Sequence, residues 1–203
     1  MPAPEALPAL RRRLRAARRA LAGAERARRD AAIVRALAVS APFRYARRIA
    51  LYLAHDGEPD LAGLLRRAWA AGKLCCLPVL APPPRGGLLF APFGPDTTLV
   101  RNRFGIPEPA HVAAVPAASL DLVLAPLVGF DPAGHRLGMG GGFYDRALAF
   151  LRRDRLRSRP RVIGVAYACQ EVPALPARPW DVPLHGVVTE QGLRLFPCAG
   201  ERP

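Results

Sequence analysis

The chain has 203 residues, of which 51% are hydrophobic and 23% are charged; this composition favours one folded domain over residues 1–203 and excludes a mainly disordered protein. No stretch approaches the roughly 18 uncharged apolar residues that a membrane-spanning helix needs, and the N-terminus lacks the pattern of a secretory signal, so we expect a cytoplasmic protein without membrane contact. The formal net charge is +14, but only one of the 30 basic residues, Lys73, is lysine, so the arginine content indicates a general bias in residue usage more than an RNA-binding surface.

Two helices are predicted at the N-terminus, where much of the positive charge lies. Residues 1–50 contain 13 arginines and 3 acidic residues. The first helix has an apolar stripe on one side and arginines on the other, because five apolar residues recur at steps of three and four: Leu7, Leu10, Leu14, Ala17 and Leu21. Such a helix must dock on the core through its stripe. An alanine-rich helix over about residues 25–39 follows Gly23 and ends before Pro42.

Strands and helices alternate along the rest of the chain. Apolar runs predict strands over residues 48–54, 73–80, 87–93, 121–130, 161–168, 185–190 and 193–196. Helical spacing predicts helices over residues 59–72 and 144–153, while residues 94–119 are proline-rich and are predicted to be irregular. This alternation predicts an α/β protein: a single domain with a mostly parallel sheet flanked by helices on both faces.

The four cysteines predict no zinc site. Cys75, Cys76, Cys169 and Cys198 form no CxxC motif and have no histidine at metal-ligand spacing. Cys75 and Cys76 lie in an apolar run, which favours small core residues of a strand over a redox role.

The segment Arg136–Arg146 (RLGMGGGFYDR) carries the most informative pattern, because it lies between a predicted buried strand and a predicted helix. Its glycines let the backbone approach a ligand and expose successive N–H groups, and the following helix adds its positive end. Arg136 and Arg146 could contact phosphate oxygens, and Asp145 could hold Mg²⁺ beside them. The segment matches neither the P-loop nor the dinucleotide-binding motif. It therefore predicts a Gly-rich phosphate loop between a central strand and a helix, with a simple tight turn as the alternative.

Six segments together point to one family. GFDPAGHRLGMGGGFYDRAL resembles the signature of the 5-formyltetrahydrofolate cyclo-ligases, also called methenyltetrahydrofolate synthetases. Other motifs of that family resemble LRRRLRAARRAL, LYLAHDGEPD, GKLCCLPVL, FGIPEP and ACQEVPALPARPWDVPLHGVVTE, which occur here in the family's order. The resemblance covers about residues 7–192, and it also implies an α/β fold.

The resemblance implies an enzyme that uses ATP and Mg²⁺ to convert 5-formyltetrahydrofolate to 5,10-methenyltetrahydrofolate, with release of ADP and phosphate. A formamide oxygen is a poor leaving group. Transfer of the γ-phosphoryl group to that oxygen creates an activated imino phosphate, which the N10 nitrogen of the folate attacks to close the ring. Such catalysis rests mainly on positioning and on neutralising phosphate charge, and it requires no nucleophile from the enzyme.

The resemblance also implies roles for individual residues. The residues expected to bind ATP are Arg11, Arg136, Leu137, Gly138, Met139, Gly140, Gly141, Gly142, Phe143 and Tyr144. The residues expected to bind the folate are His55, Glu58, Asp60, Met139, Gly140, Gly141, Gly142 and Phe143. Asp145 and Asp181 are expected to hold Mg²⁺, and the expected catalytic residues are Arg136, Tyr144 and Asp145.

Several of these residues also have ordinary structural interpretations. From the sequence alone Asp181 would be a turn carboxylate, and Glu58 would be an acidic residue at a helix start. Tyr144 could pack against the core instead of stacking on a ligand. His55 could be an exposed loop histidine as well as a pocket residue. Gln170 matches a recurrent family glutamine without an assigned role.

Two positions depart from the family pattern. The common family loop has tyrosine where this chain has Met139 and Phe143, so the folate contacts are expected to differ while the phosphate-binding residues remain. Many members have a lysine where this chain has Leu7, so one nucleotide contact is expected to be absent or supplied by Arg12 or Arg15.

Two other functions remain open from the sequence. The chain could be a basic RNA-binding module that uses the arginines of residues 11–29 and 152–161 and keeps a vestigial nucleotide loop, although the four tyrosines and two tryptophans provide little base stacking. It could also be a ligase for another ATP-activated amide or carboxylate. We expect a monomer without a nucleic-acid partner, and the sequence predicts no role for the arginine run at 152–161.

Overall fold

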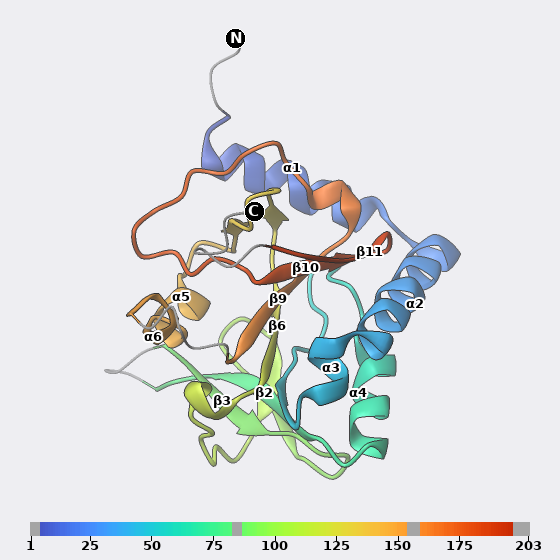
Figure 1. Ribbon diagram of the computed structural model, residues 1–203, viewed down its shortest axis with the longest axis vertical. Coiled ribbons are helices and arrows are strands. Elements are labelled where there is room, and N and C mark those ends of the chain that lie inside the picture. Colours follow the sequence, from blue (N-terminus) through green and yellow to red (C-terminus); the bar gives the residue numbers. More distant parts are fainter. Residues whose placement is uncertain (1–4, 83–86, 154–158, 197–203) are drawn as a thin grey trace.

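A seven-stranded sheet crosses the centre of the molecule in the computed structural model, which describes residues 5–82, 87–153 and 159–196 (Figure 1). In order across the sheet, the strands are β11 (Gly192–Leu195), β10 (Gly186–Thr189), β9 (Arg161–Val165), β6 (Leu122–Pro126), β1 (Arg48–Ala50), β2 (Leu74–Leu80) and β3 (Leu88–Pro92). The strands from β10 to β2 all run parallel, while β11 and β3 are antiparallel to their neighbours. The predicted mostly parallel sheet is therefore confirmed.

Helices cover both faces of this sheet, as the sequence predicts (Figure 1). On one face lie α2 (Gly23–Val39), α3 (Ala41–Tyr45) and α4 (Ala62–Ala70); on the other lie α5 (Phe143–Ala147) and α6 (Phe150–Arg153). Successive strand side chains point to opposite faces of the sheet. Cys75 therefore packs in the core on the face of α2, α3 and α4, and Cys76 packs in the core on the face of α5 and α6. Both cysteines are at most 1% exposed, which confirms them as small core residues. None of the helices in the described ranges has the length and apolar content required to cross a bilayer.

Several strands and helices begin or end at other residues than predicted. The strand predicted over residues 48–54 ends at Ala50, and the strand predicted over residues 161–168 ends at Val165. The helix predicted over residues 59–72 begins only at Ala62, where the Asp60 carboxylate accepts a hydrogen bond from the Ala62 backbone N–H (2.8 Å). The helix predicted over residues 144–153 is divided into α5 and α6.

The prediction of irregular structure over residues 94–119 is wrong in part. This segment contains an antiparallel hairpin of β4 (Leu99–Arg101) and β5 (Pro107–Pro109), followed by the 3₁₀ turn η1 (Ala117–Ser119). Proline is depleted in strands because it has no N–H to donate, so the proline-rich β5 gave no strand signal. A second hairpin, of β7 (Gly129–Phe130) and β8 (Arg136–Leu137), lies between β6 and the glycine-rich segment.

The neighbouring strands β1 and β6 send the chain to opposite faces of the sheet. After β1 the chain reaches α4 on one face, and after β6 it reaches α5 on the other. In open parallel sheets a crevice forms where the connections diverge in this way, at the carboxyl ends of the strands. The topology therefore places the segments 51–59 and 127–142 on two sides of one opening.

Helix α1 (Leu7–Ala20) packs on the segments that leave the carboxyl ends of the strands. Leu10 and Leu14 are buried against Val128 and Leu137, which follow β6. Leu14 approaches the backbone so closely that its Cδ1 lies 2.5 Å from where a Cβ on Gly129 would stand. The predicted apolar stripe therefore docks the helix beside the crevice.

Truncation of the docking leucine should destabilise the whole fold. Leu14 is 1% exposed, so Leu14→Ala should lower the free energy of unfolding by about 2–5 kcal/mol through lost burial and a cavity. Urea denaturation followed by circular dichroism measures this loss. As a control, Val39→Ala at a side chain that is 74% exposed should change stability by no more than about 0.5 kcal/mol. Equal stability of the two variants would show that α1 is not docked in solution.

Candidate active site

A cavity of about 530 Å³ opens at the crevice between the segments that follow β1 and β6. Residues from four parts of the chain line it, namely Tyr52, Leu53, His55 and Glu58 after β1; Leu77, Pro78, Leu80 and Leu88 of β2 and β3; Asn102, Phe104, Ile106, Pro107 and Glu108 of the β4–β5 hairpin; and Pro126, Leu127, Arg136, Gly138, Met139, Gly141, Gly142, Phe143, Tyr144 and Asp145. The cavity thus brings together residues predicted for ATP and residues predicted for the folate. Five predicted residues in the described ranges are outside this lining: Arg11, Asp60, Leu137, Gly140 and Asp181.

The glycine loop, residues 138–142, has the bare backbone that a phosphate-binding segment needs. Gly140 has φ +105°, and Gly142, which precedes α5, has φ +60°. Both are left-handed values that glycine adopts without strain. Arg11 Nε donates to Gly138 O at 2.9 Å, and Arg146 Nη1 donates to Gly141 O at 2.8 Å. Two arginines, from α1 and α5, therefore contact the loop directly.

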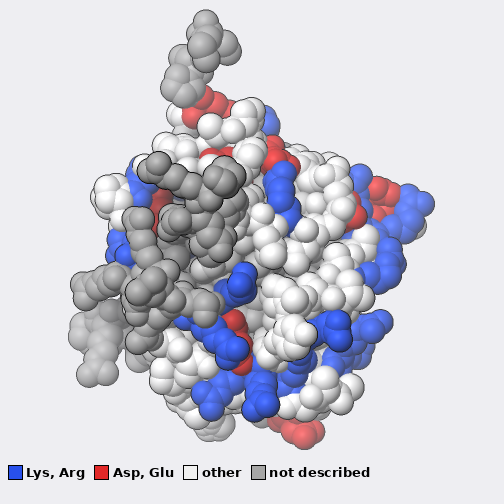
Figure 2. All heavy atoms as spheres, in the orientation of Figure 1, with Lys and Arg blue, Asp and Glu red and all other residues white. Residues whose placement is uncertain are grey.

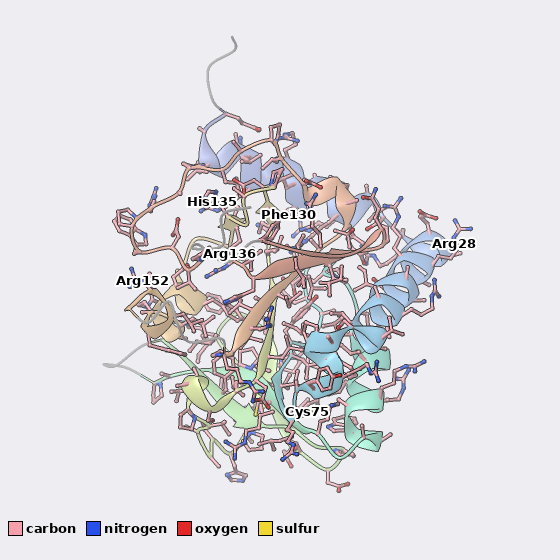
Figure 3. The ribbon with its side chains drawn as sticks, in the orientation of Figure 1. Arg28, Cys75, Phe130, His135, Arg136 and Arg152 are labelled. Atoms are coloured by element: carbon pink, nitrogen blue, oxygen red, sulfur yellow. The ribbon has the colours of Figure 1, made fainter. Side chains whose placement is uncertain are left out.

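Arg136 and Asp145 form an ion pair in the cavity wall. Arg136 Nη2 donates to Asp145 Oδ1 at 2.5 Å, and the Arg136 side chain is only 6% exposed. Asp145 Oδ1 also accepts from the Val182 backbone N–H at 3.1 Å, and Arg136 Nη1 donates to Val182 O. In Figure 3, Arg136 lies in the interior beneath α1, whereas Arg152 and Arg28 lie at opposite margins of the molecule. The pair therefore fixes a positive and a negative group at the glycine-loop end of the cavity.

Asp181 precedes Val182, whose backbone contacts both members of this pair, but the Asp181 carboxylate faces its own turn. Asp181 Oδ2 accepts from the Arg178 backbone N–H at 2.9 Å, and the Asp181 N–H donates back to Arg178 O at 3.0 Å. This is the geometry of a turn carboxylate. Because Asp145 binds the backbone of Val182, the structure still brings the two predicted metal ligands into one region. No cluster of three or more potential metal ligands occurs among the described residues.

Glu58 provides a further carboxylate in the cavity lining. Its Oε2 accepts from the His55 backbone N–H at 3.1 Å, and its Oε1 lies 3.7 Å from Arg18 Nη2. Burial raises the pKa of Glu58 to about 7, against the lowering effect of the Arg18 charge. His55 and Glu58 both line the cavity, whereas the Asp60 carboxylate accepts from the Ala62 N–H at the start of α4.

A buried ion pair beside Glu58 is absent from the sequence-based predictions. Arg18 is fully buried, and its Nη2 donates to Asp56 Oδ2 at 2.9 Å. Arg15 and Arg19 bind the same carboxylate from the surface. Arg15 is thus engaged away from the glycine loop, whose α1 contact is Arg11. The three arginines hold the pKa of Asp56 at about 2 although burial acts to raise it.

The sequence signal for Arg18 is its position on the helix. It follows Leu14 by four residues and therefore lies on the apolar stripe, where Ala17 was predicted instead. Lys and Arg are almost never fully buried unless they are paired, so an arginine at this position predicts a buried acidic partner. The partner itself is 38 residues away in the sequence and could not be read from spacing.

The β4–β5 hairpin provides an apolar wall that the sequence did not predict. Phe104 lies edge-on to Phe143 of the glycine-rich segment, with ring centroids 6.2 Å apart. Glu108 ties the hairpin to β2, because its Oε2 accepts from the Leu80 N–H at 3.1 Å and from Asn102 Nδ2 at 3.0 Å. The cavity therefore has one polar end at the glycine loop and a largely apolar body.

Tyr144 and Gln170 have different roles. Tyr144 lines the cavity, and burial together with the charge of Glu58 raises the pKa of its phenol, so the hydroxyl stays protonated. Gln170 is fully buried, and its Nε2 donates to Leu127 O at 2.9 Å and to Val128 O at 3.0 Å. Gln170 thus holds the backbone that leads from β6 towards the glycine loop.

The cavity offers two kinds of chemistry. Glycine backbone and Arg136 in the lining, with Arg11 on the glycine loop, suit the oxygens of a phosphate chain. The apolar residues of the lining together with Glu58 suit a flat heterocycle that presents N–H donors. A ligand pair of this kind would meet near Tyr144, which lines the same space.

Comparison with known proteins gives a consistent result. The family model described as "5-formyltetrahydrofolate cyclo-ligase family" matches residues 4–190. The 5-formyltetrahydrofolate cyclo-ligase of Escherichia coli K12 is 44% identical over 150 residues, which cover 73% of this chain and 80% of that protein. The enzyme of the same name from Haemophilus influenzae is 44% identical over 147 residues, covering 71% of this chain and 76% of that protein.

Two solved structures share the fold. The Aquifex aeolicus 5,10-methenyltetrahydrofolate synthetase, solved by NMR, has a TM-score of 0.80 and 30% identity, and the match covers 97% of this chain and 95% of that one. The Mycoplasma pneumoniae 5,10-methenyltetrahydrofolate synthetase has a TM-score of 0.71 at 24% identity, covering 92% and 99%. The match of the family model over nearly the whole chain, together with relatives at 44% identity, shows that the chain belongs to the 5-formyltetrahydrofolate cyclo-ligase family.

Proposed function

We propose that this chain converts 5-formyltetrahydrofolate to 5,10-methenyltetrahydrofolate with consumption of ATP in the presence of Mg²⁺. The observation that carries the proposal is the single cavity that joins the glycine loop and the Arg136–Asp145 pair to Glu58. Family membership supports the same substrate, because the relatives are named for it. The proposed reaction consumes one ATP and releases ADP and phosphate.

The glycine loop is the proposed site of the ATP phosphates. A Cβ on Gly142 would lie 3.1 Å from Arg146 Nη1, and one on Gly140 would lie 3.8 Å from Arg11 Cζ, so side chains here would enter the space beside both guanidinium groups. Bare backbone at these positions fits a phosphate chain, since N–H groups and arginines can both reach its oxygens. Arg11 and Arg136 would neutralise the charge that develops during phosphoryl transfer.

The donor set at Asp145 fits a magnesium ion. Asp145 Oδ1 is engaged by Arg136 and Val182, while Oδ2 accepts no hydrogen bond from the described residues. Mg²⁺ is usually held by one or two carboxylates together with phosphate oxygens and water. We propose Asp145 as the first protein ligand and Asp181, which is one residue from the Val182 backbone, as the second. Bound Mg²⁺ would screen the phosphate charges and orient the γ-phosphoryl group.

The pterin ring of the folate is proposed to lie in the apolar body of the cavity. The carboxylate of Glu58 can accept hydrogen bonds from the N–H donors at the edge of a pterin, and His55 N–H holds that carboxylate in place. Phe104, Phe143 and Met139 lie at the glycine-loop side of the same space. Exclusion of water from this region would protect the activated formyl group from hydrolysis.

The residues of the chain act in this reaction by positioning. ATP supplies the phosphoryl group that activates the formyl oxygen, after which N10 of the folate closes the ring and phosphate leaves. Tyr144 keeps its proton and is proposed to donate a hydrogen bond at the reacting centre. Arg136, held by Asp145, keeps a fixed positive charge there. No nucleophilic side chain is needed in this scheme.

The contacts of the N-terminal arginines do not favour the RNA-binding alternative. Arg11 binds Gly138 O, and three further arginines of α1 bind Asp56, so these charges are used within the protein. On the face drawn in Figure 2, Lys and Arg side chains are spread over the lower half and right side, with white and red atoms between them. Residues 154–158 of the second arginine run lie outside the described residues.

An absorbance assay tests the proposed function. Purified protein mixed with 5-formyltetrahydrofolate, Mg²⁺ and ATP should form methenyltetrahydrofolate, and omission of ATP should abolish product. Release of one ADP for each ring closed should accompany the reaction. ATP binding without product would point to another amide or carboxylate substrate, and failure to bind ATP would remove the proposal altogether.

Replacement of the proposed magnesium ligand should stop turnover. Asp145→Asn keeps the size of the side chain but removes its charge, so kcat should fall by about 100-fold or more through weaker metal binding and a misplaced Arg136. The assay is a titration of rate against Mg²⁺ concentration. Asp96→Asn makes the same chemical change at an exposed residue and should leave the titration unchanged. A full rate in Asp145→Asn would contradict the metal assignment.

Replacement of the arginine on the glycine loop should affect the nucleotide selectively. Arg11→Gln removes a charge-assisted contact with the loop, so KM for ATP should rise about tenfold or more while KM for the folate stays within twofold. Initial-rate kinetics with each substrate varied in turn measure both values. Arg13→Gln removes the same charge from an exposed position on α1, where the side chain pairs with Glu5, and should change neither value. Equal effects of the two variants would mean that only overall charge matters.

A further inference from the structure

The fully buried Arg18 makes contacts that neither the family resemblance nor the proposed reaction explains. Its side chain is 0% exposed, although it belongs to a helix whose other buried residues are leucines. Arg18 Nε donates to Asp56 O at 2.9 Å, and Nη2 donates to the Asp56 carboxylate at 2.9 Å. Nη1 donates to Leu127 O at 3.1 Å. Every guanidinium nitrogen therefore has a partner.

These contacts join the two sides of the cavity. Asp56 belongs to the segment after β1, which carries Glu58, and Leu127 belongs to the segment after β6, which leads to the glycine loop. Glu58 and Leu127 both line the cavity. Gln170 donates to the same Leu127 carbonyl, but Arg18 alone among these residues also reaches the Glu58 segment. One guanidinium thus spans the crevice between β1 and β6.

Packing alone gives no reason for an arginine at this position. Burial of a guanidinium carries a large desolvation cost, and well-packed apolar residues often replace buried ion pairs without loss of stability. An apolar side chain here would extend the stripe of Leu10 and Leu14. What an apolar residue cannot provide is the set of fixed hydrogen bonds to Asp56 and Leu127, or a positive charge 3.7 Å from Glu58.

We propose that Arg18 is a positioning residue for substrate binding: it fixes the distance between the Glu58 segment and the Leu127 segment and keeps the Glu58 carboxylate ionised and oriented toward the pterin. This inference rests on the proposed function of the cavity. In this proposal Arg18 does not contact the substrate and acts on substrate binding through Glu58. Its effect should therefore appear in folate affinity and its pH dependence before it appears in phosphoryl transfer.

The charges around Glu58 give the direction of the pH effect. Arg18 and Arg15 from α1 favour its ionised form, while Asp56, and the phenols of Tyr52 and Tyr144 if ionised, oppose it; His55 contributes its backbone N–H. Because the pKa of Glu58 is about 7, folate binding through the carboxylate should weaken as pH falls below that value. The pH at which folate binding is half-maximal, the pH midpoint, should therefore follow the pKa of Glu58. Removal of the Arg18 charge should raise this midpoint, and removal of the Asp56 charge should lower it.

The experiment compares three variants by titrating 5-formyltetrahydrofolate into the protein at pH values from 6 to 9. Arg18→Gln should move the pH midpoint of folate binding upward and weaken binding at pH 7, by about fivefold for an upward shift of one pKa unit. Arg18→Lys keeps the positive charge but cannot make all three hydrogen bonds of the guanidinium, so it should retain part of the affinity. Arg19→Gln, which loses only a surface contact with the same Asp56, should bind like the unmodified protein.

Asp56→Asn separates positioning from a general structural effect. Asp56 has φ 53°, a left-handed value that asparagine also adopts, so the backbone is retained. This variant breaks the same ion pair as Arg18→Gln, yet it should move the pH midpoint downward. A purely structural role of the pair would shift both variants in the same direction, and that result would overturn the proposal.

The remaining outcomes are also decisive. Unchanged affinity and pH midpoint in Arg18→Gln, with folding verified by circular dichroism, would overturn the role of Arg18 while leaving the proposed function intact. If Arg18→Gln fails to fold, Asp56→Asn still tests the downward shift of the pH midpoint, and Arg18→Lys still tests whether loss of the guanidinium hydrogen bonds lowers folate affinity. Absence of folate binding by the unmodified protein would instead refute the proposed function.

Discussion

Helix α1 is held beside the cavity by two kinds of contact, and the arrangement of the site depends on both. Leu10 and Leu14 supply apolar burial, which is strong but sets no particular distance between polar groups. Arg18 supplies directional hydrogen bonds to Asp56 and Leu127 from inside the same interface. Seven residues earlier, Arg11 reaches the glycine loop from the same helix. A single helix therefore presents one arginine to the glycine loop and another to the Glu58 segment.

The sheet determines where such a helix can act. Because β1 and β6 are neighbours whose connections go to opposite faces, their carboxyl ends leave a crevice between them. Glu58 follows one strand, and the Arg136–Asp145 pair follows the other. Side chains from two different chain segments thus meet in one cavity without a domain interface. The β4–β5 hairpin, tied to β2 by Glu108, then supplies the remaining apolar wall.

The sequence predicted those features that depend on residues close together in the chain. The glycine loop could be predicted because its glycines and flanking charged residues are consecutive in the sequence, and the parallel strands could be predicted from apolar runs. The contacts of Arg18 were not visible, because Asp56 and Leu127 are distant in the sequence and only the fold brings them together. Asp60 was predicted to bind the folate; in the structure it lies outside the cavity lining, and its carboxylate accepts from the Ala62 N–H at the start of α4. The prolines of β5 hid a hairpin that pairs despite them.

The two outer strands of the sheet are protected against pairing with further strands. An exposed sheet edge offers unpaired N–H and C=O groups to any other chain, which is a common start of aggregation. Here the outer side of β3 is partly occupied, since the Val115 N–H donates to Phe90 O at 2.7 Å. At the other edge β11 has only four residues, and it carries Arg194, which forms an ion pair with Glu171. Edge strands that are short, charged or covered hinder the pairing of the sheet with a strand of another chain. The carboxyl ends of the strands can therefore stay open around the cavity while the two outer edges of the sheet remain protected.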